Sequence, residues 1–217
     1  MTKTSSSLEP QSSASFRDQL PRRVAHTLRT PLGLVDAALR ELGATMGDEP
    51  MLVLGNRGVR QIARLADRLS LLGRLEQAEC IERQPVDLSP LVDRALHDIV
   101  ETRPRKRVRV TRGPIPAPAL ISGDGTLVRA ALAELVDNAV RFARRSVEVG
   151  AYEHDGQMVI EVRDDGPGPT KVTASEAGLG IGFYLVGTIV SLHAGRFELQ
   201  DDDGGGGLAS LVLGLAT

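Results

Sequence analysis

Two side chains in the middle of this chain could bind a divalent metal. Glu134 and Asn138 are four residues apart, so a helix would place both on one face. A carboxylate and an amide oxygen on one face can hold a hydrated Mg²⁺, which prefers oxygen ligands and keeps several waters. Arg141 lies nearly one turn further along, where its guanidinium could contact a phosphate, and Phe142 offers a flat ring to a base.

Two glycine-containing segments follow, Asp-Asp-Gly-Pro-Gly at residues 164–168 and Gly-Leu-Gly-Ile-Gly at residues 178–182. An aspartate at a strand end can accept a hydrogen bond from an exocyclic amine, and glycines allow a planar ring to approach closely. Backbone N–H groups at a helix N-terminus suit phosphates. Together with the preceding helix, this order of segments predicts a nucleotide pocket. Its candidate residues in these two segments are Asp164, Gly166, Gly168, Gly178, Gly180 and Gly182.

His26 is the candidate nucleophile. A histidine side chain can offer an unprotonated ring nitrogen near neutral pH, and such a nitrogen can attack phosphorus. The residue lies off the apolar row formed by Val24, Leu28 and Leu32, so its ring is expected to face solvent. The three other histidines lack a comparable context.

The residues around His26 predict a helical hairpin. Apolar residues recur at three- and four-residue steps within residues 16–42 and again within residues 59–75, and residues 43–50 are typical of a loop. One hairpin buries only one stripe on each helix, so we expect a homodimer with a four-helix bundle. Pro31 leaves two alternatives: one kinked helix through the proline, or a helix that begins there.

The remaining sequence predicts an α/β sandwich, with one mostly antiparallel sheet and helices on one face. Ser89 is the expected N-cap of the first helix of this domain. The predicted helices are residues 91–100, 125–143 and 182–194, and the predicted strands are residues 108–110, 146–152, 158–163, 196–199 and 208–215. The predicted fold class is therefore α+β, with a disordered tail at residues 1–16, the hairpin at residues 17–84 and the sandwich at residues 85–217.

Composition fits this organisation. The chain has 217 residues, 41% of them hydrophobic, and its formal charge of −2 gives no reason to expect nucleic-acid binding. It contains no apolar run near 18 residues, so no membrane span is expected. The single cysteine, Cys80, suits the reducing cytoplasm.

These motifs, in this order, resemble the sensor histidine kinases of two-component systems. The resemblance covers the chain from about residue 18 onward and implies a histidine-phosphotransfer hairpin followed by a GHKL-type ATP-binding domain. It implies a cytoplasmic homodimeric enzyme that transfers the γ-phosphoryl group of ATP to His26, and then to an aspartate on the receiver domain of a response regulator. Arg29 and Thr30 follow the acceptor in the same motif, so the resemblance implies that they are catalytic residues too.

The resemblance also implies roles for the pocket residues. Asn138 would ligate Mg²⁺, and Glu134 would lie beside the metal's water or the incoming histidine, as a second candidate metal ligand. Arg141 would contact phosphate and Phe142 the adenine ring. Asp164 would select adenine through its amino group, and the glycines of its motif would shape the pocket wall.

The chain departs from the family pattern at two places. Thr27 follows the histidine, where the family commonly has Glu or Asp, and a hydroxyl cannot act as a base near pH 7. Losing a general base can cost roughly 10²–10⁴-fold in rate, and the absent acid also puts phosphatase activity in doubt. The nine residues 169–177 between the glycine motifs form a short lid without phenylalanine.

Two alternatives to an active histidine kinase therefore stay open. The chain could be a degenerate kinase that acts as a phosphotransfer or regulatory dimer. It could also be a related ATPase that phosphorylates protein serine, as anti-sigma-factor kinases do, although the hairpin histidine argues against this.

Overall fold

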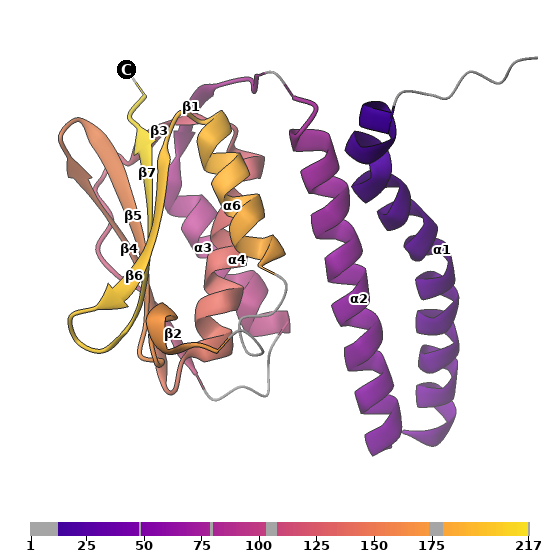
Figure 1. Ribbon diagram of the computed structural model, residues 1–217. Helices are drawn as coiled ribbons and strands as arrows, with labels where there is room; N and C mark the ends of the chain where they lie inside the picture. Colours follow the sequence, from indigo (N-terminus) through magenta and orange to yellow (C-terminus); the bar gives the residue numbers. More distant parts are fainter. Residues whose placement is uncertain (1–12, 48, 79, 103–107, 174–179, 217) are drawn as a thin grey trace, which may run out of the picture. The chain divides into compact units, whose positions relative to one another are not determined.

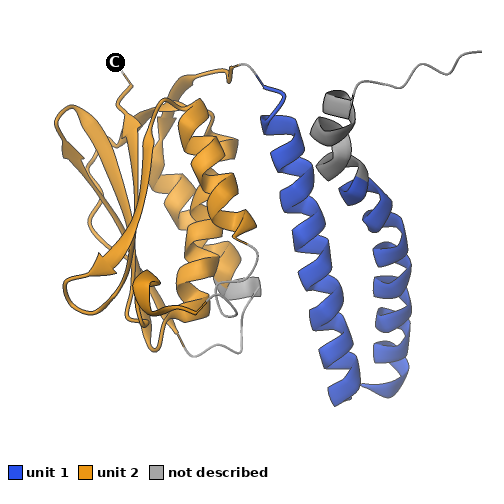
Figure 2. Cartoon of the chain, in the orientation of Figure 1, with its two compact units in different colours: residues 1–78 blue, residues 79–217 orange. Residues whose placement is uncertain are grey.

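A computed structural model describes residues 13–47, 49–78, 80–102, 108–173 and 180–216 (Figure 1). The chain divides into two compact units, Met1–Ala78 and Glu79–Thr217 (Figure 2). The sequence-based boundary lies between residues 84 and 85, within the first strand of the second unit. None of the helices in the described ranges is long and apolar enough to cross a membrane.

The first unit is a helical hairpin of α1 (Ser13–Met46) and α2 (Pro50–Leu75). Of the two alternatives at Pro31, the structure has a single helix that continues through the proline. The loop between the helices is shorter than expected because α1 extends to Met46 and Pro50 opens α2, where its fixed φ and missing N–H are tolerated. Across the hairpin, Arg29 of α1 forms an ion pair with Asp67 of α2 at 2.8 Å.

The second unit contains a five-stranded sheet with the order β2-β4-β5-β7-β6. β2 pairs with β4 in parallel, and the other neighbouring strands are antiparallel. The strands are β2 (Arg109–Arg112), β4 (Ser146–His154), β5 (Gln157–Asp164), β6 (Arg196–Asp202) and β7 (Gly206–Gly214). All five were predicted, with ends that differ by a few residues.

Helices α3 (Leu88–Thr102), α4 (Gly125–Phe142) and α6 (Ile181–Leu192) cover one face of this sheet (Figure 1). The core lies between the two layers and is almost wholly aliphatic. Its fully buried side chains include Leu132 and Leu135 of α4, Ile160 of β5 and Leu211 of β7. The predicted fold class, a helical hairpin followed by an α/β sandwich, is confirmed.

A second, two-stranded sheet was not predicted. β1 (Gln84–Asp87) and β3 (Leu120–Gly123) pair antiparallel. The predicted cap of α3 was also wrong, because Ser89 lies inside the helix. Its N–H donates to the Asp87 carboxylate at 3.0 Å, so Asp87 caps the helix instead.

Candidate nucleotide-binding site

Helix α4 positions the predicted metal-binding pair. The Asp124 carboxylate caps the helix by accepting hydrogen bonds from the N–H groups of Thr126 and Leu127, at 2.8 and 3.2 Å. The helix buries its apolar stripe against the core, while Glu134 and Asn138 stay half-buried at the edge of that stripe. Two oxygen-bearing side chains therefore leave the helix at the same edge of its apolar stripe.

Glu134 lies against the start of α6. A Cβ atom added at Gly182 would be 2.8 Å from Glu134 Oε2, so the carboxylate occupies the space that a side chain would need. Gly180, the N-cap of α6, has a left-handed φ of 68° and provides no side-chain cap. The structure thus brings Glu134 together with Gly182, two residues after Gly180, as expected of a site for phosphate and metal. Gly178 lies outside the described residues.

The last turn of α4 carries the other two predicted contacts. The Arg141 guanidinium lies over the Phe142 ring, with its carbon 5.0 Å from the ring centre. Arg141 is exposed and Phe142 is half-buried. The cationic and aromatic groups expected for phosphate and adenine are therefore in contact with each other.

Asp164 ends β5 next to that turn. Its Oδ1 accepts a hydrogen bond from the Gly166 N–H at 2.8 Å. A Cβ atom added at Gly166 would lie 2.5 Å from this oxygen and 2.7 Å from the Phe142 carbonyl oxygen, and one at Gly207 would lie 2.5 Å from Asp164 Oδ2. Gly166, just after β5, and Gly207 of β7 therefore make the space in which the Asp164 carboxylate lies, close to the backbone of Phe142.

The neighbouring Asp165 has a role that sequence reasoning missed. Its Oδ1 accepts hydrogen bonds from the backbone N–H groups of Arg144, Arg145 and Ser146, at 2.9, 2.9 and 3.1 Å. Burial raises the pKa of this carboxyl, but the backbone hydrogen bonds lower it by more, so its pKa is below the usual value. Asp165 thereby joins the segment after α4 to the end of β5.

Gly168 begins the segment that leaves the pocket. It has φ of 80°, and an added Cβ atom would lie 2.5 Å from Asp201 Oδ1. Asp201, at the end of β6, accepts hydrogen bonds from the hydroxyl and the N–H of Thr170, and these bonds lower the pKa of its carboxyl. The short helix η1 (Pro169–Lys171) is therefore held against β6. Nothing in the sequence indicated this role of Asp201. Residues 174–177 of the predicted lid lie outside the described residues.

The described residues contain no group of three or more His, Cys, Asp or Glu side chains that could hold a metal alone. Mg²⁺ bound with a nucleotide needs only one or two protein oxygens, because phosphates and waters complete its shell. The pair Glu134 and Asn138 fits that requirement.

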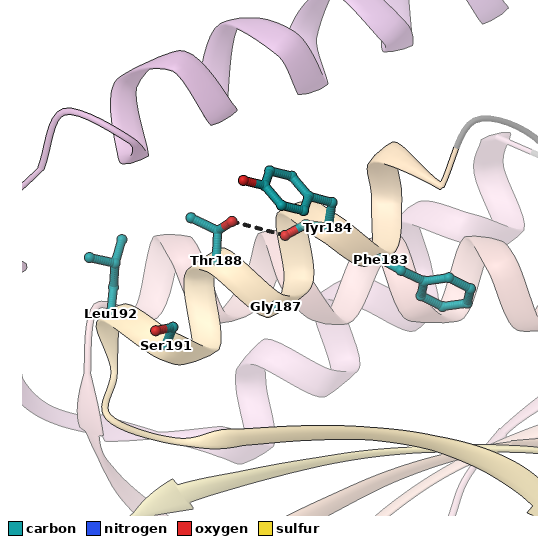
Figure 3. Close-up of a pocket in the computed structure, with 6 residues that line it drawn as sticks. All are labelled: Phe183, Tyr184, Gly187, Thr188, Ser191 and Leu192. Atoms are coloured by element: carbon teal, nitrogen blue, oxygen red, sulfur yellow. Dashed lines mark hydrogen bonds between the residues drawn. The ribbon is translucent and has the colours of Figure 1, made fainter. Parts of the chain in front are cut away.

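A depression elsewhere on the unit does not coincide with the predicted nucleotide residues. It lies over α6 and is lined by Phe183, Tyr184, Gly187, Thr188, Ser191 and Leu192 (Figure 3). Within it, the Thr188 hydroxyl donates to the Tyr184 carbonyl oxygen at 2.9 Å. Since that polar group bonds to its own helix, we assign no ligand to this surface.

In the helical hairpin, His26 lies on α1 with its side chain exposed, as predicted. Thr30 is one turn along and is also exposed. Arg29 is held by its ion pair with Asp67. The structure therefore leaves the ring of His26 accessible for reaction.

Residues 123–217 match the family of histidine kinase-, DNA gyrase B- and HSP90-like ATPases. This segment is an ATPase domain of that family. It contains α4, Asp164 and α6, and therefore every predicted nucleotide-contacting residue.

Similarity extends beyond the ATPase domain into the helical hairpin. Over 208 residues the chain is 30% identical to the sensor protein CutS of Streptomyces coelicolor, covering 84% of this chain and 49% of CutS. It is 32% identical over 203 residues to the sensor-type histidine kinase PrrB of Mycobacterium leprae, covering 84% of this chain and 44% of PrrB. The chain thus spans about half the length of these curated relatives.

The fold is also similar to that of a solved structure. The structure of full-length ShkA in complex with AMPPNP matches 92% of this chain and 46% of ShkA, with a TM-score of 0.71 and 22% sequence identity. The expected resemblance is confirmed: the ATPase domain is of the GHKL type, and the homologues are sensor histidine kinases.

Proposed function

We propose that this chain is the cytoplasmic core of a histidine kinase, which binds ATP in its ATPase domain and phosphorylates His26. The observation that carries the proposal is the close approach of the Glu134 carboxylate, from α4, to Gly182 at the start of α6. This arrangement lies in a domain of the histidine kinase-like ATPase family, and the hairpin that precedes it carries an exposed histidine.

The proposed reaction is an in-line phosphoryl transfer. An unprotonated nitrogen of His26 forms a bond to the γ-phosphorus, the bond from that phosphorus to the bridging oxygen breaks, and ADP leaves. Such reactions depend mainly on alignment and charge neutralisation. The phosphoryl group then passes to an aspartate on the receiver domain of a response regulator.

Each pocket residue has a defined task in this proposal. Asp164 accepts a hydrogen bond from the adenine amino group, and the Phe142 ring packs on the base after Arg141 turns to the phosphates. Glu134 and Asn138 would hold Mg²⁺, which supplies charge neutralisation at the phosphates when bound. Because Thr27 cannot take a proton near pH 7, Glu134 is also the candidate base for the acceptor histidine.

The exposed apolar surface of the hairpin supports a homodimer. Eight of the twelve large hydrophobic side chains that are exposed in the described residues lie on α1 and α2. They are Val24, Leu34, Val35, Leu42, Met46, Met51, Leu54 and Ile62. A second copy of the hairpin would cover these side chains in a four-helix bundle.

Labelling with γ-labelled ATP and Mg²⁺ tests the kinase proposal. We expect an acid-labile, base-stable label that is lost in His26→Ala and kept in His154→Ala. His154 is a suitable control because it is also exposed, but is the last residue of strand β4 in the other unit.

Two other outcomes would contradict the proposal. If nucleotide binds and no label appears, the chain has no autokinase activity, and a phosphotransfer or regulatory role replaces it. If the label is acid-stable and remains in His26→Ala, the acceptor is a hydroxyl group and the chain acts as a serine kinase. A purified receiver domain added to the labelled protein tests the second transfer.

A further inference from the structure

His193 is a buried histidine that the proposed reaction does not use. It directly follows α6, and only 3% of its surface is exposed. Its Nε2 lies 3.0 Å from the backbone N of Asp124, and its Nδ1 lies 2.7 Å from the Ile189 carbonyl oxygen. A backbone N–H can only donate, so Nε2 must be the unprotonated acceptor, and Nδ1 then carries the proton and donates to Ile189.

The ring packs directly against the backbone at the end of β3. A Cβ atom added at Gly123 would lie 2.4 Å from His193 Cδ2 and 2.7 Å from Nε2. Gly123 is the last residue of β3, and Asp124 is the N-cap of α4. His193 therefore joins the C-terminal end of α6 to the N-terminal end of α4.

The two ends of α6 both contact α4. His193 bonds Asp124 at one end, and Gly182 lies against Glu134 at the other, so the helices run antiparallel side by side (Figure 1). At 1.5 Å per residue, the ten steps from Asp124 to Glu134 span about 15 Å, and the eleven from Gly182 to His193 span about 16.5 Å. The matching lengths mean that a bond at one end sets the axial register at the other.

We propose that neutral His193 is a positioning residue for the nucleotide site. Its hydrogen bond to the Asp124 N–H fixes the register of α4 against α6. It thereby sets the spacing between the Glu134 and Asn138 side chains and the backbone amides at the start of α6. This inference rests on the proposed binding of Mg²⁺-ATP by the same two helices.

A pair of variants separates this role from a merely structural one. In His193→Gln, the amide oxygen can take the place of Nε2 and keep the bond to Asp124. In His193→Asn, the shorter amide reaches only the position of Nδ1 and loses that bond. Both remove the imidazole ring, so a requirement for the ring alone affects them equally.

The measured quantity is the dissociation constant of Mg²⁺-ATP, obtained by calorimetry on the full chain. We expect binding about fivefold or more weaker in His193→Asn and within about twofold of the unsubstituted protein in His193→Gln, since only the Asn variant leaves the Asp124 N–H without its buried acceptor. Equal affinities in the two variants, whether both normal or both weakened, would overturn the proposal.

Nuclear magnetic resonance of the unsubstituted protein supplies a second test that does not depend on either variant folding. The ¹⁵N shift of His193 should show an unprotonated Nε2, and Mg²⁺-ATP should slow hydrogen exchange at the Asp124 amide, because coupling between two sites is reciprocal. A protonated Nε2 or an unchanged exchange rate refutes the inference. If calorimetry detects no nucleotide binding at all, the proposed function fails, while the Nε2 shift still reports on the helix link.

Discussion

Substitution of Gly182 by alanine should separate the stability of α6 from its function. Alanine is favoured over glycine in a helix by about 1 kcal/mol, so the folded state should be stabilised or unchanged. The added Cβ atom would lie 2.8 Å from Glu134 Oε2, whereas ordinary contacts begin at 3.4 Å, so the carboxylate must move by about 0.6 Å. Weakening one charged interaction by about 1.4 kcal/mol would reduce affinity about tenfold. We therefore expect Mg²⁺-ATP to bind about tenfold more weakly.

Gly187→Ala is the matched control for this experiment. Gly187 lies in the same helix, and an added Cβ atom would meet no described residue within 4 Å. It should gain a similar helix stabilisation and keep its nucleotide affinity within about twofold. Urea unfolding gives the free energy of each variant, and calorimetry gives the dissociation constant. The reasoning is refuted if Gly182→Ala binds Mg²⁺-ATP as tightly as Gly187→Ala, because Glu134 would then have no role beside α6.

Three further outcomes are expected. Gly166→Ala should lose nucleotide binding and about 2 kcal/mol of unfolding free energy, because its Cβ atom would lie 2.7 Å from the Phe142 carbonyl oxygen; normal binding in calorimetry would contradict this. Asp165→Asn should make the stability of the protein less dependent on pH in acid. The pKa of the Asp165 carboxyl is lower in the folded protein than in the unfolded chain. The carboxylate therefore stabilises the fold above the unfolded pKa, near 3.9, and this contribution is lost as pH falls through the folded pKa. Unfolding midpoints measured from pH 6 down to 2 should fall less steeply in the variant, and equal slopes would count against it. Leu54→Glu, on the 61% exposed Leu54 of α2, should shift the protein to a monomer in sedimentation, whereas an unchanged dimer would exclude this face as the interface.

Elements with local signals could be predicted from the sequence. The β4–β5 hairpin follows from two alternating strands around Asp155-Gly156, and both turn residues have positive φ, 49° and 71°. Helix α4 follows from its apolar periodicity, and its face carries Glu134 and Asn138 as expected. In these cases the pattern lies within the segment that folds.

Elements that depend on distant partners could not be predicted. β1 and β3 are four residues each, and Pro85 in β1 argues against a strand unless its partner is known. The task of Asp165 depends on N–H groups about 20 residues earlier, and that of His193 on one 69 residues earlier. A single sequence shows the residue types at such positions, but not which backbone groups face them.

The position of β7 in the sheet has a consequence for synthesis of the protein. β7 is the last of the described strands in sequence order, yet it lies between β5 and β6, and eight of its nine residues are buried. While the ribosome is still adding residues 206–214, β5 and β6 have no common neighbour, and Asp164 has no Gly207 beside its carboxylate. The nucleotide pocket can therefore form only after translation has passed β7, and a nascent chain stalled before that strand would expose the apolar faces that β7 covers.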